Sequence, residues 1–136
     1  MDKTQEIKNY FNKIAPSRDV WKSKAKYYHQ QMEKLFKFLI PEDKKVLEIG
    51  CGTGDLLHAV KPSYGMGVDI SQVMIQEARK KYGKLTFKIE NAQNFTLNQK
   101  FDYVILSDVI GNFEDVQKAF SELHKVSDEK TKIITS

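Results

Sequence analysis

The sequence predicts an α/β protein built on a doubly wound parallel sheet, and three observations carry this prediction. From residue 44 onward, short apolar segments alternate with amphipathic segments of helical length, which is typical of consecutive strand–helix–strand units. The segment VLEIGCGTGDLL at 46–57 joins an apolar strand to a turn with glycines at positions 50, 52 and 54. The next expected strand, 64–70, brings Asp69 to its end. Backbone without Cβ atoms beside an acidic strand end predicts a ligand site at this edge of the sheet.

Two helices are expected ahead of the sheet, as an N-terminal helical cover over 1–43. The first is expected at 3–14, before Pro16 interrupts the pattern. The second is expected at 18–39, and Pro41 ends it because proline has no N–H to donate. Its apolar residues recur at three- and four-residue steps, which predicts one stripe packed against the sheet rather than a ligand contact. This stripe comprises Trp21, Ala25, Tyr28, Met32, Leu35 and Leu39.

The remainder of the chain, 44–136, is expected to form the sheet core of a single domain. Right-handed crossovers restrict its parallel strands to the order 3-2-1-4-5. The third and fourth strands are expected to follow one another without a full helix, because 91–98 is expected to be irregular with at most one helical turn. The expected strands are 46–49, 64–70, 85–90, 101–107 and 131–135, and the expected helices are 55–60, 72–82 and 113–126.

The predicted strand order also locates the ligand site. The chain adds its second and third strands on one side of the first strand and its fourth and fifth strands on the other side. Ligands bind outside the carboxyl ends of the strands at such a reversal point. The loops that arrive there begin at Gly50, Ile70, Glu90 and Ser107.

The last expected helix is amphipathic. One side of it collects Val116, Phe120, Leu123 and Val126. Such spacing is typical of an amphipathic helix.

Composition predicts a soluble, cytoplasmic protein. Apolar residues make up 40% and charged residues 29% of the 136 residues, and no apolar run approaches the roughly 20 residues of a membrane-spanning helix. The N-terminus, MDKTQEIKNYF, lacks the apolar core of a secretory signal. The single cysteine, Cys51, cannot form an internal disulfide, which fits a reducing compartment.

The net charge of +4 comes almost entirely from lysine, since Arg18 and Arg79 are the only arginines. The lysines are dispersed along the chain among acidic residues. Nucleic-acid recognition favours arginine for its fixed fork of donors. We therefore expect a solvated basic surface and no nucleic-acid partner.

The glycine turn differs from the loops that bind phosphate groups. The dinucleotide fingerprint is G-x-G-x-x-G, whereas the glycines here alternate and Asp55 stands where the third glycine would be. A carboxylate at this helix N-terminus would repel a pyrophosphate. The phosphate-loop ending Gly-Lys-Ser/Thr is absent as well. The turn therefore suits a ligand that has a sugar and an amino-acid end but no phosphate.

Four sequence blocks follow one another in the order and at the spacing of one known family. They are VLEIGCGTGDLL (46–57), GMGVDIS (65–71), FKIENAQNF (87–95) and FDYVILSDVIGNFEDV (101–116). On these blocks the chain resembles the class I S-adenosylmethionine-dependent methyltransferases of the small-molecule type, which have a Rossmann-like fold. A single G-x-G would be weak support, whereas four blocks in register are specific.

The resemblance implies that S-adenosylmethionine is the cofactor, with S-adenosylhomocysteine as its product. Glu48 is implied to anchor the methionine end. Asp69 is implied to accept both ribose hydroxyls, since each oxygen of a carboxylate can take one. The turn that passes under the methionine and ribose would consist of Gly50, Cys51, Gly52 and Gly54.

The adenine site is also implied by the resemblance. Ile70 and Met74 match apolar positions that flank the adenine, and the amide of Ala92 can reach its ring. Asn91 stands where many members carry an aspartate that faces the adenine amino group. An asparagine oxygen accepts that hydrogen bond without charge assistance, so somewhat weaker adenine binding is expected.

No catalytic residue can be assigned. Ser107 and Asp108 match the strand end beside the sulfonium, and Asp108 is a weak candidate for a base or substrate anchor, with a helix cap as the alternative. Cys51 is interpreted as a small loop residue rather than a nucleophile. The histidines lie in expected helices as surface or packing residues, and no metal site is predicted from the spacing of His29, His58 and His124.

The segment after the fourth strand bears on the methyl acceptor. Family branches that methylate amide or nucleobase amino groups carry Asn/Asp-Pro-Pro-Tyr there, whereas this chain has Ser-Asp-Val-Ile at 107–110. Methylation of a nucleobase amino group is therefore disfavoured, and the resemblance to the small-molecule type implies a small-molecule acceptor. Two alternatives stay open: a module that binds the cofactor without turnover, and a nicotinamide-dependent oxidoreductase.

The chain ends at Ser136, directly after the fifth expected strand. The last two strands of the family's sheet are therefore expected to be absent. The strand at 131–135 would then be an open edge, which invites pairing with a second copy or another protein. Three explanations stay open: a fragment of a longer methyltransferase, a wall borrowed from a partner, or a complete module that only binds the cofactor.

Overall fold

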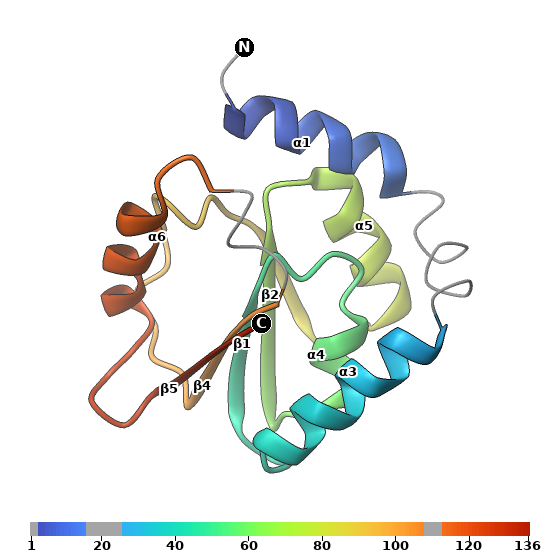
Figure 1. The fold of residues 1–136 in the computed structure, drawn as a ribbon, viewed down its shortest axis with the longest axis vertical. Coiled ribbons are helices and arrows are strands. Elements are labelled where there is room, and N and C mark those ends of the chain that lie inside the picture. The colour runs from blue at the N-terminus through green and yellow to red at the C-terminus, as the bar shows by residue number, and fades with distance from the viewer. Residues whose placement is uncertain (1–2, 16–25, 108–112) are drawn as a thin grey trace.

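The computed structural model describes residues 3–15, 26–107 and 113–136 (Figure 1). Its helices are α1 (Lys3–Ile14), α3 (Lys26–Leu39), α4 (Asp55–Ala59), α5 (Gln72–Lys81) and α6 (Val116–Glu122), followed by the short 3-10 helix η3 (Leu123–Lys125). Its strands are β1 (Lys45–Ile49), β2 (Tyr64–Asp69), β3 (Thr86–Ile89), β4 (Tyr103–Leu106) and β5 (Lys132–Thr135). Strands and helices alternate except that β4 follows β3 directly, as predicted.

The strands form one parallel sheet in the order β3-β2-β1-β4-β5, which confirms the predicted order. In the central strand, Glu48 lies opposite Gly67 of β2 and Ile105 of β4. Figure 1 shows α6 beside one face of the sheet, α3, α4 and α5 beside the other, and α1 across one end. The carboxyl ends of all the strands meet at a single edge, because the strands run in the same direction.

Alternate strand residues enter two apolar clusters, one on each face of the sheet. On β1, Leu47 and Ile49 belong to the cluster that includes Leu123 of η3. Val46, on the opposite face of the same strand, belongs to the cluster that includes Phe36 of α3. Burial on both faces explains why consecutive residues of β4, Tyr103–Leu106, are all apolar and buried rather than alternating with polar residues.

A glycine in β2 allows close packing beside the central strand. A Cβ atom at Gly67 would lie 2.7 Å from the Cys51 sulfur and 2.8 Å from the Phe87 ring. Real side chains do not approach this closely. The missing side chain therefore lets Phe87 of β3 and the turn after β1 pack directly on β2.

The packing of α3 corrects the predicted apolar stripe. Phe36 is completely buried, whereas Leu35 is 47% and Leu39 is 40% exposed. The helix is rotated so that Met32, Phe36 and Ile40, at four-residue steps, face the sheet. Apolar residues occupy more than one face of this helix, so their periodicity alone could not indicate which face meets the sheet.

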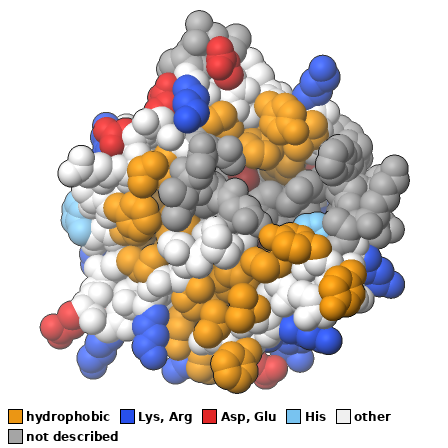
Figure 2. Space-filling view, viewed as in Figure 1, with side chains coloured by type: hydrophobic (Ala, Val, Ile, Leu, Met, Phe, Trp, Pro, Cys, Tyr) orange, Lys and Arg blue, Asp and Glu red, His pale blue; other side chains and the backbone are white. Residues whose placement is uncertain are grey.

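The outer face of α3 is also apolar. Tyr27 is 77% and Phe38 is 85% exposed. Figure 2 shows hydrophobic side chains gathered in the lower part of the same view, where Figure 1 draws α3 and the nearby strands. Two residues of the predicted stripe, Trp21 and Ala25, lie outside the described residues.

The last helix begins later than predicted and buries a narrower face. Asp115 is its N-cap, because its carboxylate accepts a hydrogen bond from the Lys118 amide at 2.9 Å. Ala119 and Leu123 are buried, whereas Phe120 is 41% exposed. Of the predicted apolar side, Leu123 and Val126 are therefore buried, whereas Phe120 and Val116, which is 40% exposed, are not.

The described sheet has β3 and β5 at its two edges. Ile133 on β5 is 42% exposed. Association of this edge with a second chain stays a prediction, as does the division into a cover over 1–43 and a core over 44–136. Within the described ranges, none of the helices has the length and apolar character needed to span a bilayer.

Candidate functional site

A cavity of about 300 Å³ lies at the carboxyl ends of β1, β2, β3 and β4. This volume falls at the lower end of the range for small-molecule sites. Its walls come from the turn after β1, the segments after the other three strands, and the helices α1 and α3. The cavity therefore occupies the point at which the winding of the sheet reverses, as the sequence predicted.

The glycine turn follows β1 and forms one wall of the cavity. Gly50 and Gly52 have φ angles of 73° and 55°, a region that residues with a side chain adopt at a cost. The amides of Gly50 and Cys51 both donate to the Val68 carbonyl, at 2.8 and 3.0 Å. These bonds hold the turn against the end of β2, with Gly50, Cys51 and Gly52 in the cavity wall.

Gly54 is not among the residues that line the cavity. Its φ is 87°, and a Cβ atom there would lie 2.7 Å from the Phe87 ring. A packing requirement therefore accounts for this glycine. The cofactor contact assigned to Gly54 stays a prediction.

Asp69 ends β2 and lines the cavity. One oxygen of its carboxylate accepts from the Gly52 amide and the other from the Ser71 amide, both at 2.9 Å. A carboxylate can accept about four hydrogen bonds. The two amides thus fix the orientation of the Asp69 carboxylate in the cavity wall.

Glu48 and Cys51 occupy the buried part of the cavity wall. Glu48, at the end of β1, is only 4% exposed. Burial raises the pKa of the Cys51 thiol well above its ordinary value, and the charges of Glu48 and Asp69 raise it further. The thiol is therefore protonated at neutral pH, which agrees with its interpretation as a loop residue rather than a nucleophile.

We expect Cys51 to react with iodoacetamide at pH 8 more slowly in the folded chain than in urea, because burial raises the pKa of the thiol and so lowers the thiolate fraction. Labelling followed by mass spectrometry measures both rates. The raised pKa has a second consequence. As the pH rises above 9.0, the ordinary pKa, the Cys51 thiol ionises in the unfolded chain before it does in the folded chain. The free energy of unfolding is therefore expected to fall above that pH. Cys51→Ala should remove this part of the decline, and equal labelling rates would contradict the assignment.

Asp55 begins α4 and lines the cavity. Its carboxylate forms an ion pair with Lys81 at 2.8 Å and accepts hydrogen bonds from the hydroxyls of Thr53 and Tyr82. The ammonium of Lys81 offsets part of the negative charge. The electrostatic argument against a pyrophosphate is therefore weaker in the structure than in the sequence.

The segment after β3 is ordered by its own side chains. The Asn91 side chain accepts from the Gln93 amide at 2.9 Å, and an isolated bridge joins Asn91 to Asn94. Asn91, Ala92 and Gln93 all line the cavity. The carboxylate of Glu90 accepts from the Thr96 amide at 2.8 Å and so closes the loop.

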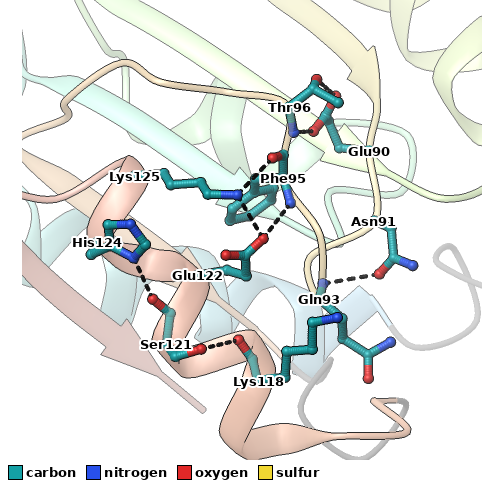
Figure 3. A network of polar contacts seen from close by, with 10 residues as sticks. All are labelled: Glu90, Asn91, Gln93, Phe95, Thr96, Lys118, Ser121, Glu122, His124 and Lys125. Carbon is teal, nitrogen blue, oxygen red and sulfur yellow. Dashed lines mark hydrogen bonds and ion pairs between the residues drawn. The ribbon is translucent and has the colours of Figure 1, made fainter.

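The same segment is attached to α6 and η3 (Figure 3). The Phe95 amide donates to Glu122 at 2.9 Å, and the Lys125 ammonium donates to the Phe95 carbonyl at 3.0 Å. Lys125 also pairs with Glu122 at 2.9 Å, and this hydrogen bond lowers the pKa of the Glu122 carboxyl. Hydrogen bonds at Phe95 therefore hold the segment against α6 and η3.

The remaining predicted positions lie around the same cavity. Ile70, Met74 and Ser107 are in its wall, and Met74 is buried. Asp108, the weak catalytic candidate, lies outside the described residues.

Two helices supply cavity residues that the sequence motifs did not indicate. The wall includes Thr4, Ile7 and Phe11 of α1, and His29 and Met32 of α3. His29 was interpreted as a surface or packing residue, because nothing in its spacing distinguishes it from the other histidines. The cavity wall also includes Tyr28, Glu33, Gln93 and Phe113.

A parallel sheet in this order, with a glycine turn and an acidic strand end around a cavity at the reversal point, defines a Rossmann-like ligand-binding protein. A family model described as "Methyltransferase domain" matches residues 40–136. The chain belongs to this methyltransferase domain family.

Individual relatives agree with this assignment. The ubiquinone/menaquinone biosynthesis C-methyltransferase UbiE of Campylobacter jejuni is 30% identical and aligns with 93% of this chain and 60% of its own length. The demethylmenaquinone methyltransferase of Bacteroides fragilis is 26% identical over 91% of this chain and 56% of its own. The chain thus spans about 60% of the length of these curated relatives.

A solved structure shows the same fold. An S-adenosylmethionine-dependent methyltransferase of Thermotoga maritima, described as a possible histamine N-methyltransferase, superposes with a TM-score of 0.82. The two sequences are 22% identical, and the superposition covers 94% of this chain and 60% of that one.

Proposed function

We propose that the cavity binds S-adenosylmethionine, and that the chain is the cofactor-binding part of a methyltransferase with a small-molecule acceptor. The observation that carries the proposal is the Asp69 carboxylate, oriented by two main-chain amides beside the glycine turn. Membership of the methyltransferase family supports it. The relative from Campylobacter jejuni is named as a C-methyltransferase of quinone biosynthesis, and the Thermotoga maritima protein as S-adenosylmethionine-dependent.

The residues present fit the chemical groups of this cofactor. Asp69 would accept from the ribose diol, and the charge of Glu48 would attract the ammonium of the methionine end. Backbone at Gly50 and Gly52, where no Cβ intrudes, would lie under the methionine and ribose. The segment at 91–92 would meet the adenine, with Ile70 and Met74 on the apolar sides of the ring.

The protein's part in methyl transfer would be alignment and exclusion of water. The cofactor supplies an electrophilic methyl group when bound. Ile7, Phe11 and Met32 make part of the wall apolar, which favours loss of the sulfonium charge as the methyl group leaves. The acceptor would be held in line with the breaking bond by the wall that α1 and α3 supply.

Titration calorimetry tests the cofactor assignment. We expect S-adenosylmethionine and S-adenosylhomocysteine to bind the purified chain, and NAD to produce no heat of binding. The physical reason is that the turn lacks the third glycine of the dinucleotide fingerprint, since Asp55 stands at that position at the start of α4. Binding of NAD in preference to S-adenosylhomocysteine would overturn the proposal and favour an oxidoreductase.

A second measurement separates an enzyme from a module that only binds the cofactor. The chain is incubated with S-adenosylmethionine and a metabolite pool, and release of S-adenosylhomocysteine is followed by mass spectrometry. Release above that of an Asp69→Ala control supports methyl transfer. Binding without release from this chain, or from the longer protein if one exists, supports the binding module.

A further inference from the structure

We infer that Gln93 is a positioning residue that joins α1, the roof of the cavity, to the segment proposed to hold the adenine. The inference rests on the proposed function, because it gives the segment at 91–93 a cofactor to respond to. Gln93 is 8% exposed and lines the cavity. A buried amide side chain needs partners for both its oxygen and its nitrogen, and those partners come from different parts of the chain.

Three segments meet at this side chain. The side-chain oxygen of Gln93 accepts from the Asp115 amide at 2.5 Å, and its nitrogen donates to the Thr4 hydroxyl at 3.4 Å. The main-chain amide of Gln93 donates to the Asn91 side chain, as Figure 3 shows. Gln93 therefore links the segment after β3 to the N-cap of α6 and to the first turn of α1.

The first turn of α1 is held by a second residue as well. The carboxylate of Glu114 accepts from the Lys3 amide at 2.7 Å and from the Thr4 hydroxyl at 2.8 Å. A carboxylate at a helix N-terminus also interacts favourably with the helix dipole. Thr4 thus stands between Gln93 and Glu114, so a change at Gln93 reaches the end of the helix directly.

The other end of α1 rests on the segment that follows β2. The Asn12 side chain accepts from the Ser71 hydroxyl and from the Val73 amide, the latter at 3.3 Å. Ser71 also donates its own amide to Asp69. Both supports of α1 are therefore segments that carry proposed cofactor residues, and Ile7 of α1 lines the cavity between them.

This arrangement couples the cofactor to the roof. A ligand that orders the segments at 69–74 and 91–93 also stabilises α1, and by reciprocity a seated α1 favours the ligand. Gln93 carries the coupling at one end of the helix and Asn12 carries it at the other.

Hydrogen exchange of the full chain, with and without S-adenosylhomocysteine, tests the inference. In the unaltered chain we expect the ligand to slow exchange at amides of α1 and of α5. In Gln93→Ala we expect the slowing to be lost in the N-terminal half of α1, which Gln93 contacts, and to remain in the C-terminal half, which Asn12 holds, and at α5. We expect calorimetric affinity to fall about two- to tenfold. Gln76→Ala, at an exposed position of α5, is the matched control and should behave as the unaltered chain.

Thr4→Val provides an independent test, because it removes the hydroxyl from α1 and leaves the segment at 91–93 unaltered. We expect it to reproduce the loss at α1, and the double variant with Gln93→Ala to be no worse than either single change. If Gln93→Ala does not fold, as judged by circular dichroism, Thr4→Val decides the result. Ligand-induced slowing that persists in the N-terminal half of α1 in Thr4→Val would overturn the inference, whereas failure of the unaltered chain to bind would overturn the proposed function instead.

Discussion

Asp69→Asn is expected to weaken binding of S-adenosylhomocysteine by about 1.5–3 kcal/mol, roughly 10- to 150-fold, the range for a hydrogen bond to a charged group. In the unaltered chain, both carboxylate oxygens accept main-chain amides, from Gly52 and from Ser71, at 2.9 Å. Asparagine has only one oxygen, so its NH₂ group must face one of these donors. The side chain would lose both its charge and the orientation needed for a diol. Titration calorimetry measures the change.

Asp102→Asn is the matched control for this substitution. The Asp102 carboxylate also accepts a main-chain amide, from Lys45 at 2.9 Å. It lies where β1 and β4 begin, at the opposite edge of the sheet from the cavity. We expect its affinity for the ligand to be unchanged. Equal losses in the two variants, or no loss in Asp69→Asn, would show that Asp69 does not hold the ribose.

Phe36→Ala is expected to lower the free energy of unfolding by about 3–5 kcal/mol, the usual cost of truncating a fully buried phenylalanine. Phe36 has no exposed surface and belongs to the cluster that also contains Val46, Leu57 and Ile105. Its loss would leave a cavity between α3 and the sheet. Urea unfolding followed by circular dichroism measures the difference.

Phe38→Ala, two residues along the same helix, makes the same chemical change on the outer face. Phe38 is 85% exposed, so we expect the free energy of unfolding to change by no more than about 0.5 kcal/mol. A larger cost at Phe38 than at Phe36 would mean that α3 packs on the sheet through its other face. The pair therefore tests the orientation of the helix, which periodicity did not resolve.

Much of the proposed cofactor site could be predicted from the sequence, because its residues lie in segments that directly follow strands. Strand order, set by the handedness of crossovers, brings those segments to one place. Of the predicted residues, Glu48, Asp69 and Asn91 are examples that line the cavity. Gly54 differs, since its backbone conformation and the nearby Phe87 ring account for it without a ligand contact.

The roof of the cavity could not be predicted in this way. Thr4 belongs to α1, which forms the roof, and His29 belongs to the neighbouring wall helix α3. Both helices precede the sheet, and no local spacing connects these residues with the strand ends. Gln93 was not predicted to be a site residue, although it directly follows Asn91 and Ala92, which were. Its importance depends on partners at Thr4 and Asp115, which are far from it along the chain.

The order of helices and strands, the strand sequence in the sheet and the loops at the reversal point all follow from patterns within short stretches of this chain, because period, turn residues and crossover handedness are local properties. The face that α3 presents to the sheet, the residues of the cavity roof and the partners of Gln93 depend on which distant segments touch. Those contacts exist only once the sheet has assembled and the helices have packed on it, so they had to be observed in the folded molecule.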